Sequence, residues 1–106
     1  MWSVAFLDER VVAEIGEQPA DIRAAFERVV RLIHEIGLER GREPYVKHLE
    51  GRLWEMRLKG KDGIARAIYV TASQRRIVVI RVFTKKSEKT PPRELEVARQ
   101  RAKEVI

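Results

Sequence analysis

Three stretches in the second half of the sequence have the pattern of β-strands, and short turns separate them. Residues 53–58 alternate apolar and polar side chains, residues 64–70 follow with a second strand pattern, and residues 77–84 are the most β-branched run of the chain. Alternation indicates a half-buried strand, and β-branched side chains favour a pleated sheet. Residues 59–63, which contain two Gly, and residues 74–76 supply the turns. This half of the chain therefore predicts an antiparallel sheet with residues 77–84 as its central strand.

The first half of the chain adds helices to this sheet. Residues 2–7 predict a short strand, and residues 9–15 predict a short helix that Asp8 caps. Residues 19–36 predict a longer helix, because their apolar side chains recur at helical spacing and form one stripe. The polar residues 38–52 contain two Gly and one Pro, and we interpret them as a loop that leads to the sheet.

A final helix follows the sheet. Thr90 has the side chain of an N-cap, Pro91 and Pro92 suit a first helical turn, and the helix is expected to run to about Lys103. The resulting order, β-α-α-β-β-β-α, predicts an α+β fold in which helices cover one face of an antiparallel sheet. With 106 residues, the chain is expected to form one domain, residues 1–106.

Composition excludes several classes of protein. The chain has no cysteine, which excludes a disulfide scaffold, a thiolate zinc site and a cysteine nucleophile. No apolar run approaches the length of a membrane span, and charged residues begin too early for a signal peptide. We therefore expect a soluble cytoplasmic protein that does not bind membranes.

The charge of the chain is unevenly distributed. Residues 1–50 hold 7 Lys and Arg against 10 Asp and Glu, a net charge of −3, whereas residues 51–106 hold 15 against 6, a net charge of +9. A basic half attracts polyanions, above all nucleic acid, through contacts with phosphate. The alternative is an ordinary solvated basic surface.

Basic residues recur within the predicted strands. Arg57, Arg66 and Arg81 lie in three consecutive strands, and the last strand leads into a lysine-rich segment, residues 85–89. A charge inside a strand is costly unless its face is wet or the charge is paired. We expect one solvent-exposed, cationic sheet face that binds anions. The alternative is that neighbouring carboxylates neutralise these arginines, Arg57 through Glu55 and Arg81 through a helix.

Such a surface suits the cleavage of RNA, which carries its own nucleophile, the 2′-hydroxyl. Arginines contact phosphate in bidentate fashion, and clustered cations lower the pKa of a lysine enough for it to act as a base. The two histidines, His34 and His48, are not accompanied by other metal ligands. We expect His34 to be structural, and we expect neither a metal nor another cofactor.

Several motifs of this chain resemble those of one toxin family. Residues 44–49 (PYVKHL) and 53–57 (LWEMR) resemble the P-x-x-K-x-L and L-W-E-[LM]-R signature of RelE/HigB-like toxins, in the phage-derived HigB branch. Arg66 and Tyr69 are similar to the R-x-x-Y element of that family.

The resemblance continues to the C-terminus. Residues 83–91 (FTKKSEKTP) are similar to the F-x-K-K-[ST]-x-K-T-P element, and residues 94–102 resemble the helix that follows it. The motifs cover residues 40–106. The resemblance implies the small RelE-like fold and a type II toxin that cleaves mRNA in the ribosomal A site. It also implies a cognate helix-turn-helix antitoxin, and we include a homodimer of the isolated chain among the expected assemblies.

The resemblance and the strand pattern together name the site residues. As catalytic residues we predict Arg57, Arg66 and Lys85. As RNA-binding residues we predict Arg81, which is added from the strand pattern, with Lys86, Lys89, Lys59 and His48. RelE-like enzymes often place a Tyr or His near the C-terminus, but residues 91–106 contain neither. A Lys or Arg is therefore the expected proton donor, and Tyr69 is open to burial in the core.

Two other functions remain as alternatives. A ParE-like toxin, which shares the fold, inhibits DNA gyrase without being an enzyme. A regulatory module would bind only its antitoxin and DNA.

Overall fold

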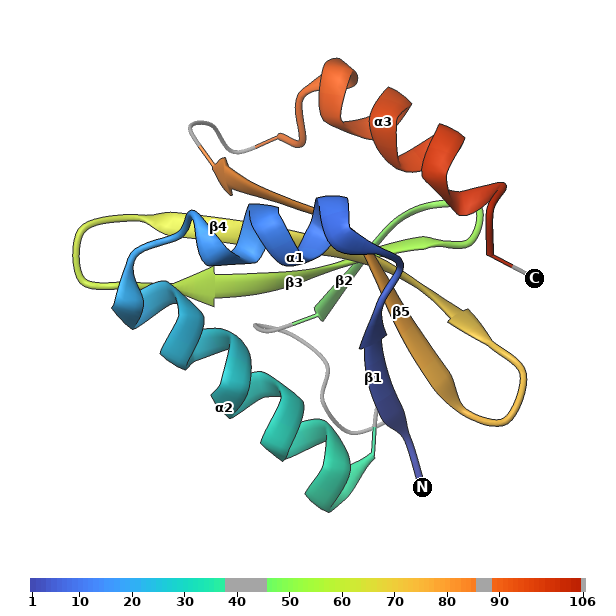
Figure 1. Ribbon diagram of the computed structural model, residues 1–106, viewed down its shortest axis with the longest axis horizontal. Helices are drawn as coiled ribbons and strands as arrows, with labels where there is room; N and C mark the ends of the chain where they lie inside the picture. The colour runs from blue at the N-terminus through green and yellow to red at the C-terminus, as the bar shows by residue number, and fades with distance from the viewer. Residues whose placement is uncertain (38–45, 86–88, 106) are drawn as a thin grey trace.

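The computed structural model describes residues 1–37, 46–85 and 89–105, and for Lys85 it describes the backbone alone (Figure 1). Among these residues the chain forms three helices and five strands. In chain order they are β1 (Ser3–Phe6), α1 (Glu9–Gly16), α2 (Ala20–Ile36), β2 (Val46–Glu50), β3 (Leu53–Lys59), β4 (Ile64–Ala72), β5 (Arg76–Lys85) and α3 (Pro92–Ala102).

The α+β fold class is confirmed, and the order of elements is compatible with a RelE-like fold. The strands lie in the order β1-β5-β4-β3-β2, so the β-branched strand β5 lies inside the sheet. The pairs β2–β3, β3–β4 and β4–β5 are antiparallel, but β1 lies parallel to β5. The sheet is therefore mixed, and the expectation of a purely antiparallel sheet was wrong.

Strand β2 lies inside the segment that we interpreted as a loop. Its sequence, Val46-Lys47-His48-Leu49-Glu50, is mostly polar, and it occupies the edge of the sheet beside β3. In this edge strand only Val46 is fully buried; Lys47 and His48 are exposed, and Leu49 packs partly buried against the sheet. The loop interpretation of residues 38–52 was therefore wrong for β2, and residues 38–45 lie outside the described part of the chain.

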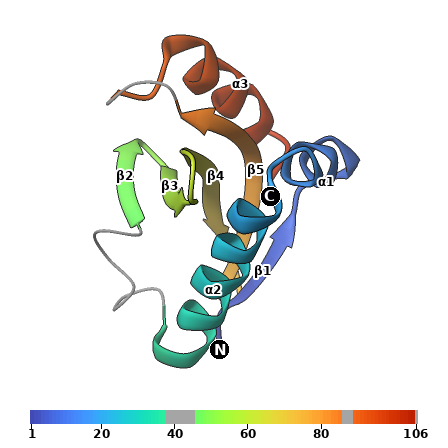
Figure 2. The same cartoon turned by 90° about the vertical axis from the view of Figure 1, so that its left-hand side faces the viewer.

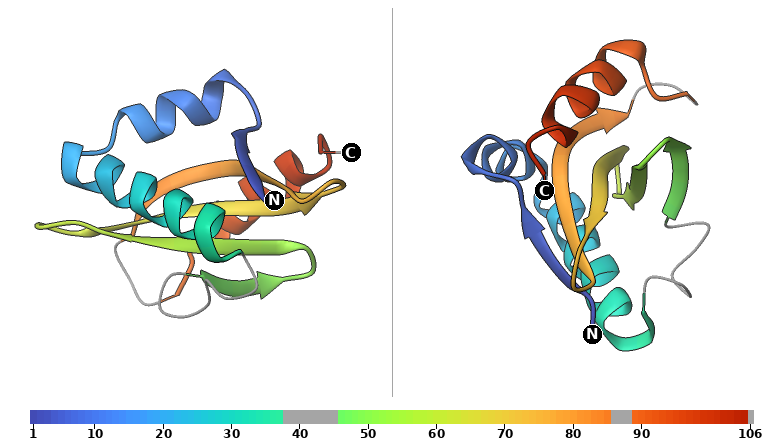
Figure 3. Two further views of the ribbon diagram at one scale, coloured as in Figure 1. Left: turned by 90° about the horizontal axis from the view of Figure 1, so that it is seen from below. Right: turned by 90° about the vertical axis from the view of Figure 1, so that its right-hand side faces the viewer.

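Helices pack on both faces of the sheet, which corrects the prediction that they share one face. On one side, α1 and α2 cover a core that includes Met56, Leu58 and Tyr69. On the other, α3 covers a core that includes Ile68 and Phe83. Figures 2 and 3 show α3 at a distance from α2. We call the two sides of the sheet the α2 face and the α3 face.

The helix ends follow the sequence signals in part. Asp8 caps α1 by accepting a hydrogen bond from the backbone N–H of Arg10 at 3.0 Å. Gly37 follows α2 with a φ of 83°, which glycine adopts at little cost. Thr90 does not cap α3, however, because Pro91 occupies the N-cap position and the Thr90 hydroxyl binds elsewhere. None of the helices in the described ranges is both long and apolar enough to cross a membrane.

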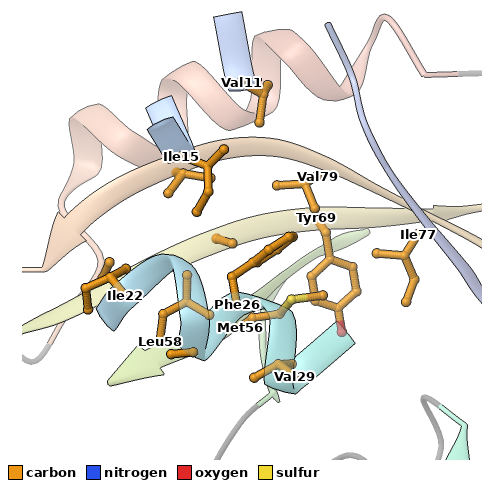
Figure 4. Close-up of a cluster of buried hydrophobic side chains, with 14 of the residues drawn as sticks. Val11, Ile15, Ile22, Phe26, Val29, Met56, Leu58, Tyr69, Ile77 and Val79 are labelled. Carbon is orange, nitrogen blue, oxygen red and sulfur yellow. The ribbon is translucent and has the colours of Figure 1, made fainter. Parts of the chain in front are cut away.

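Tyr69 belongs to the core of the α2 face. Its side chain is fully buried, and its ring lies between Met56 and Ile77 (Figure 4). The hydroxyl has no hydrogen-bond partner among the described residues, and burial raises the pKa of Tyr69. Because the phenol stays protonated and cannot reach solvent, Tyr69 is a packing residue rather than an acid that could serve a reaction.

We expect Tyr69→Phe to raise the free energy of unfolding by about 1 kcal/mol, because it removes a buried hydroxyl that makes no hydrogen bond. Urea denaturation measures this change. Tyr69→Ala serves as the contrast and should cost about 3–5 kcal/mol, since it opens a cavity. A clear loss of stability in Tyr69→Phe would show that the hydroxyl makes a stabilising contact.

Candidate functional site

The sheet brings two of the predicted site residues together. Arg57 in β3 and Arg66 in β4 are directly opposite each other in the antiparallel register. Both lie on the α3 face, because Leu53, four residues before Arg57, and Ile68, two residues after Arg66, are in phase with them and belong to the core beneath α3. Like charges placed opposite each other destabilise a sheet, so this pair of arginines calls for a compensating anion.

Glu55 supplies that anion for Arg66. The Nη1 of Arg66 donates a hydrogen bond to Oε1 of Glu55, and the two side chains are only 1% and 2% exposed. The Oε2 of Glu55 accepts a further hydrogen bond from the hydroxyl of Thr90 at 3.0 Å. This buried network joins β3, β4 and the segment that precedes α3.

The burial of Arg66 corrects the expectation of a solvent-exposed cationic face. The segment around Thr90 and helix α3 cover this part of the sheet. The neighbours of Arg66 are apolar there: Ile68 follows it on the same face of β4, Phe83 lies opposite it in β5, and both are buried beneath α3. Glu55 lies in the motif of residues 53–57, and from the sequence we considered it only as a partner of Arg57. Its pairing with Arg66 follows from the register, which the motif alone does not specify.

Arg57 differs from Arg66 because it keeps an available charge. Its side chain is half-buried, and no hydrogen bond or ion pair between described residues involves it. The guanidinium therefore lies next to a neutralised Arg66–Glu55 pair without a carboxylate of its own. A half-buried arginine of this kind can bind an anion from solution, and phosphate offers the bidentate geometry that it prefers.

Lys47 lies on the other side of Glu55. It occupies the position in β2 that is directly opposite Glu55 in β3, and its side chain is exposed. Lys47 belongs to the motif of residues 44–49, but the motif alone gave it no role, because this segment was interpreted as a loop. Its position follows from the strand register, since Lys47 lies opposite Glu55 while the neighbouring Val46 is buried.

Two lysines at one end of the sheet, Lys59 and Lys85, pair with the same residue of β4. Ile64, the first residue of β4, pairs with Lys59 on one side and with Lys85 on the other. Lys59 is exposed at the end of β3, two residues after Arg57 and therefore on the same face. Lys89 is also exposed. Lys86 lies outside the described residues.

Arg81 does not lie with Arg57, Arg66 and Lys59, which we call the basic cluster. It forms ion pairs with Glu14 of α1 at 2.7 Å and with Glu94 of α3 at 2.6 Å. The hydrogen bonds with Glu94, followed by the nearby charge of Glu14, raise the pKa of Arg81. Its charge is neutralised at the junction of the two helices, which confirms the alternative that a helix carboxylate pairs with it.

Glu14 is a second residue whose importance the sequence did not reveal. Besides Arg81, it pairs with Arg101 at 2.9 Å and accepts a hydrogen bond from the backbone N–H of Val82 at 3.0 Å. On the side of β5 away from β4, Val82 has no strand neighbour among the described residues, because β1 pairs only with Arg76 to Val79. Glu14 therefore covers an open edge of the sheet and has a structural role.

His48 also lies away from the arginines. Its ring packs against Trp54 with centroids 4.7 Å apart, and its Nε2 is 2.8 Å from the carbonyl oxygen of Gly51. His48 and Trp54 are opposite each other in register and share the α2 face. Among the described residues, no group of three His, Asp or Glu side chains is placed to hold a metal ion.

Comparison with known proteins places the chain in one family. The family model for the phage-derived protein Gp49-like (DUF891) matches residues 13–103, which include every described residue of the cluster. No curated protein matches the chain.

The Glu55–Arg66 pair makes a prediction about stability. We expect Glu55→Leu and Arg66→Met each to cost about 3–5 kcal/mol, because each leaves one buried charge without its partner. The double variant Glu55→Leu/Arg66→Met should cost less than either single variant, since no buried charge remains. Urea denaturation of the four proteins measures the coupling, and additive costs would contradict the buried pair.

Proposed function

The chain belongs to the Gp49-like family of phage-derived proteins, which is associated with toxin–antitoxin systems, and from this we propose that it is a type II toxin that cleaves mRNA on the ribosome. A toxin of this kind has a cognate antitoxin as its partner. We propose that the antitoxin is a helix-turn-helix protein and that the toxin acts in the ribosomal A site.

The single observation that carries this proposal is the position of Arg57. Its guanidinium is half-buried and lies opposite Arg66, whose own charge Glu55 already neutralises. Arg57 therefore keeps a charge that no carboxylate among the described residues neutralises, and a bound phosphodiester would accept its bidentate hydrogen bonds. The arrangement therefore supports a phosphate-binding function on the α3 face.

The proposed reaction uses the nucleophile of the RNA. The 2′-hydroxyl oxygen bonds to the adjacent phosphorus, the bond from phosphorus to the 5′-oxygen breaks, and the products are a 2′,3′-cyclic phosphate and a 5′-hydroxyl. Arg57 would bind the phosphate oxygens, whose negative charge grows as the bond forms. Glu55 would act indirectly, by fixing Arg66 beneath the phosphate.

Proton transfer is assigned to lysines. We propose that Lys85 accepts the proton of the 2′-hydroxyl, since its backbone lies at the end of β5 beside the arginine pair, and that a Lys or Arg gives a proton to the departing 5′-oxygen. Lys59, Lys86 and Lys89 would contact neighbouring phosphates. Tyr69 does not serve as the acid, because its buried side chain faces the opposite side of the sheet from Arg66.

The burial of Arg66 favours a second candidate, a ParE-like toxin that inhibits DNA gyrase. A catalytic arginine needs access to the substrate, and Arg66 is 1% exposed. Induced expression followed by mapping of mRNA 5′ ends separates the two candidates. New ends in phase with codons support cleavage on the ribosome, whereas growth arrest without new ends, accompanied by inhibited gyrase, supports the ParE-like alternative.

We expect Arg57→Ala to reduce mRNA cleavage by about 10²-fold, as is typical when one phosphate-stabilising donor is removed. Its thermal stability should be retained, because Arg57 takes part in no hydrogen bond or ion pair between described residues. Arg28→Ala is the matched control: Arg28 is an exposed arginine of α2, and its loss should leave cleavage unchanged. Equal cleavage by Arg57→Ala and wild type would remove the basis of the proposal.

Lys85→Arg tests the assignment of the base. Arginine keeps the positive charge but stays protonated in proteins, so it cannot accept a proton. We expect the variant to sediment with ribosomes as the wild type does and to leave mRNA uncut. If it cuts at the normal rate, Lys85 contributes only its charge.

A further inference from the structure

The turn between β4 and β5 has an unfavourable backbone for its sequence. Gln74 and Arg75 have φ angles of 63° and 54°, and they are the non-glycine residues with positive φ in the described part of the chain. Two consecutive left-handed residues are typical of a type I′ hairpin turn, which favours Asn-Gly. Residues other than Gly, Asn and Asp are disfavoured in this region because Cβ approaches the following carbonyl oxygen. The chain therefore keeps Gln74 and Arg75 where Asn-Gly would give a more stable turn.

The same turn carries two positive charges that the fold does not neutralise. Arg75 and Arg76 are exposed, and neither takes part in an ion pair between described residues. The Nε of Arg76 donates only to the carbonyl oxygen of Ser73, at 3.2 Å. Glu104 lines a cavity together with Arg76, but its carboxylate is already paired with Arg10 at 2.9 Å.

The turn is far from the candidate site. Ala72, at the end of β4, lies six residues beyond Arg66, which corresponds to roughly 20 Å along an extended strand. This separation exceeds the Debye length of about 8 Å at physiological salt, so the two groups of cations act independently. Figure 1 shows the β4–β5 turn projecting at the lower right, clear of α1 and α2.

We infer that the β4–β5 turn is a second RNA contact, in which Arg75 and Arg76 bind the sugar–phosphate backbone at a distance from the cleavage site. RNA is favoured over an acidic protein because the exposed side chains of the turn, Ser73 to Arg76, are polar or cationic. Strained residues persist where a function needs them, and here the strained turn places Arg75 at the tip of the hairpin. The inference rests on the proposed function, since both surfaces would serve one RNA-bound toxin.

Two glycine variants separate charge from strain. Gln74→Gly and Arg75→Gly each relieve one left-handed residue, so both should raise the melting temperature by about 4 °C. Only Arg75→Gly removes a charge. We expect Gln74→Gly to bind RNA as the wild type does. Arg75→Gly should bind RNA several-fold more weakly, and the slope of log K against the logarithm of the salt concentration should be smaller in magnitude by about 1. A protein that gains stability while it loses binding cannot owe that loss to misfolding.

The binding assay uses two RNA probes and one charge control. Purified 70S ribosomes test for contacts with ribosomal RNA, and a 2′-O-methyl oligoribonucleotide, which cannot be cleaved, tests for contacts with the messenger. A loss confined to ribosomes identifies ribosomal RNA as the source of the phosphate, and a loss on both probes identifies single-stranded RNA as well. Arg31→Ala, which removes an exposed arginine from α2, should bind both probes as the wild type does.

Three outcomes would overturn the inference. The first is wild-type affinity of Arg75→Gly for both probes, and the second is an equal loss of affinity in Arg31→Ala. The third is a loss of antitoxin binding alone, which would make the turn a protein surface. These outcomes are independent of the proposed function, because cleavage is read separately from mRNA 5′ ends. If the protein cleaves mRNA but Arg75→Gly binds RNA as the wild type does, only the second RNA contact is refuted. If Arg75→Gly loses RNA binding but the wild type does not cleave mRNA, only the enzymatic activity is refuted.

Discussion

The ion pair between Glu55 and Arg66 is the interaction on which the α3 face depends. Two charges that leave water remain tolerable only while they stay together and keep their hydrogen bonds. Glu55 meets this condition by binding Arg66 with one oxygen and Thr90 with the other. The pair thereby fixes β3 against β4 and anchors the segment that leads into α3. It also cancels the charge of Arg66, which allows Arg57 to lie directly opposite.

The sequence predicted the parts of the fold that follow from local patterns. Strands β3 and β5 were found because one alternates and the other is β-branched. The mixed polar strand β2 was missed, because a strand at the edge needs only one buried side chain and shows no clear period. The packing of helices on both faces was missed because Arg66, within β4, was taken to indicate a solvent-exposed face. In β4, Ala65 to Val70 is buried without alternation, which indicates cover on both faces.

The site was predicted less completely than the fold, because charge in a strand does not reveal its partner. Arg57, Arg66 and Arg81 gave the same signal in the sequence, yet they have three different surroundings. Two carboxylates neutralise Arg81: Glu94 lies 13 residues away in α3 and Glu14 lies 67 residues away in α1, and no local pattern connects either with the strand. Glu55 is nearer to Arg66 in sequence, but the pairing depends on strand register. Only Arg57 retains the character that the pattern predicted for all three.

The spacing of Arg66 and Tyr69 explains why a loss of function at either residue is hard to interpret. Three residues along a regular strand place two side chains on opposite faces, so Arg66 lies beneath α3 and Tyr69 beneath α2. Each is fully buried, and each supports a different core. Loss of toxicity on truncating Arg66 would therefore combine a broken ion pair with any missing contact to phosphate. Arg57, which shares the site but not the buried network, is the position where a change in activity reports on chemistry alone.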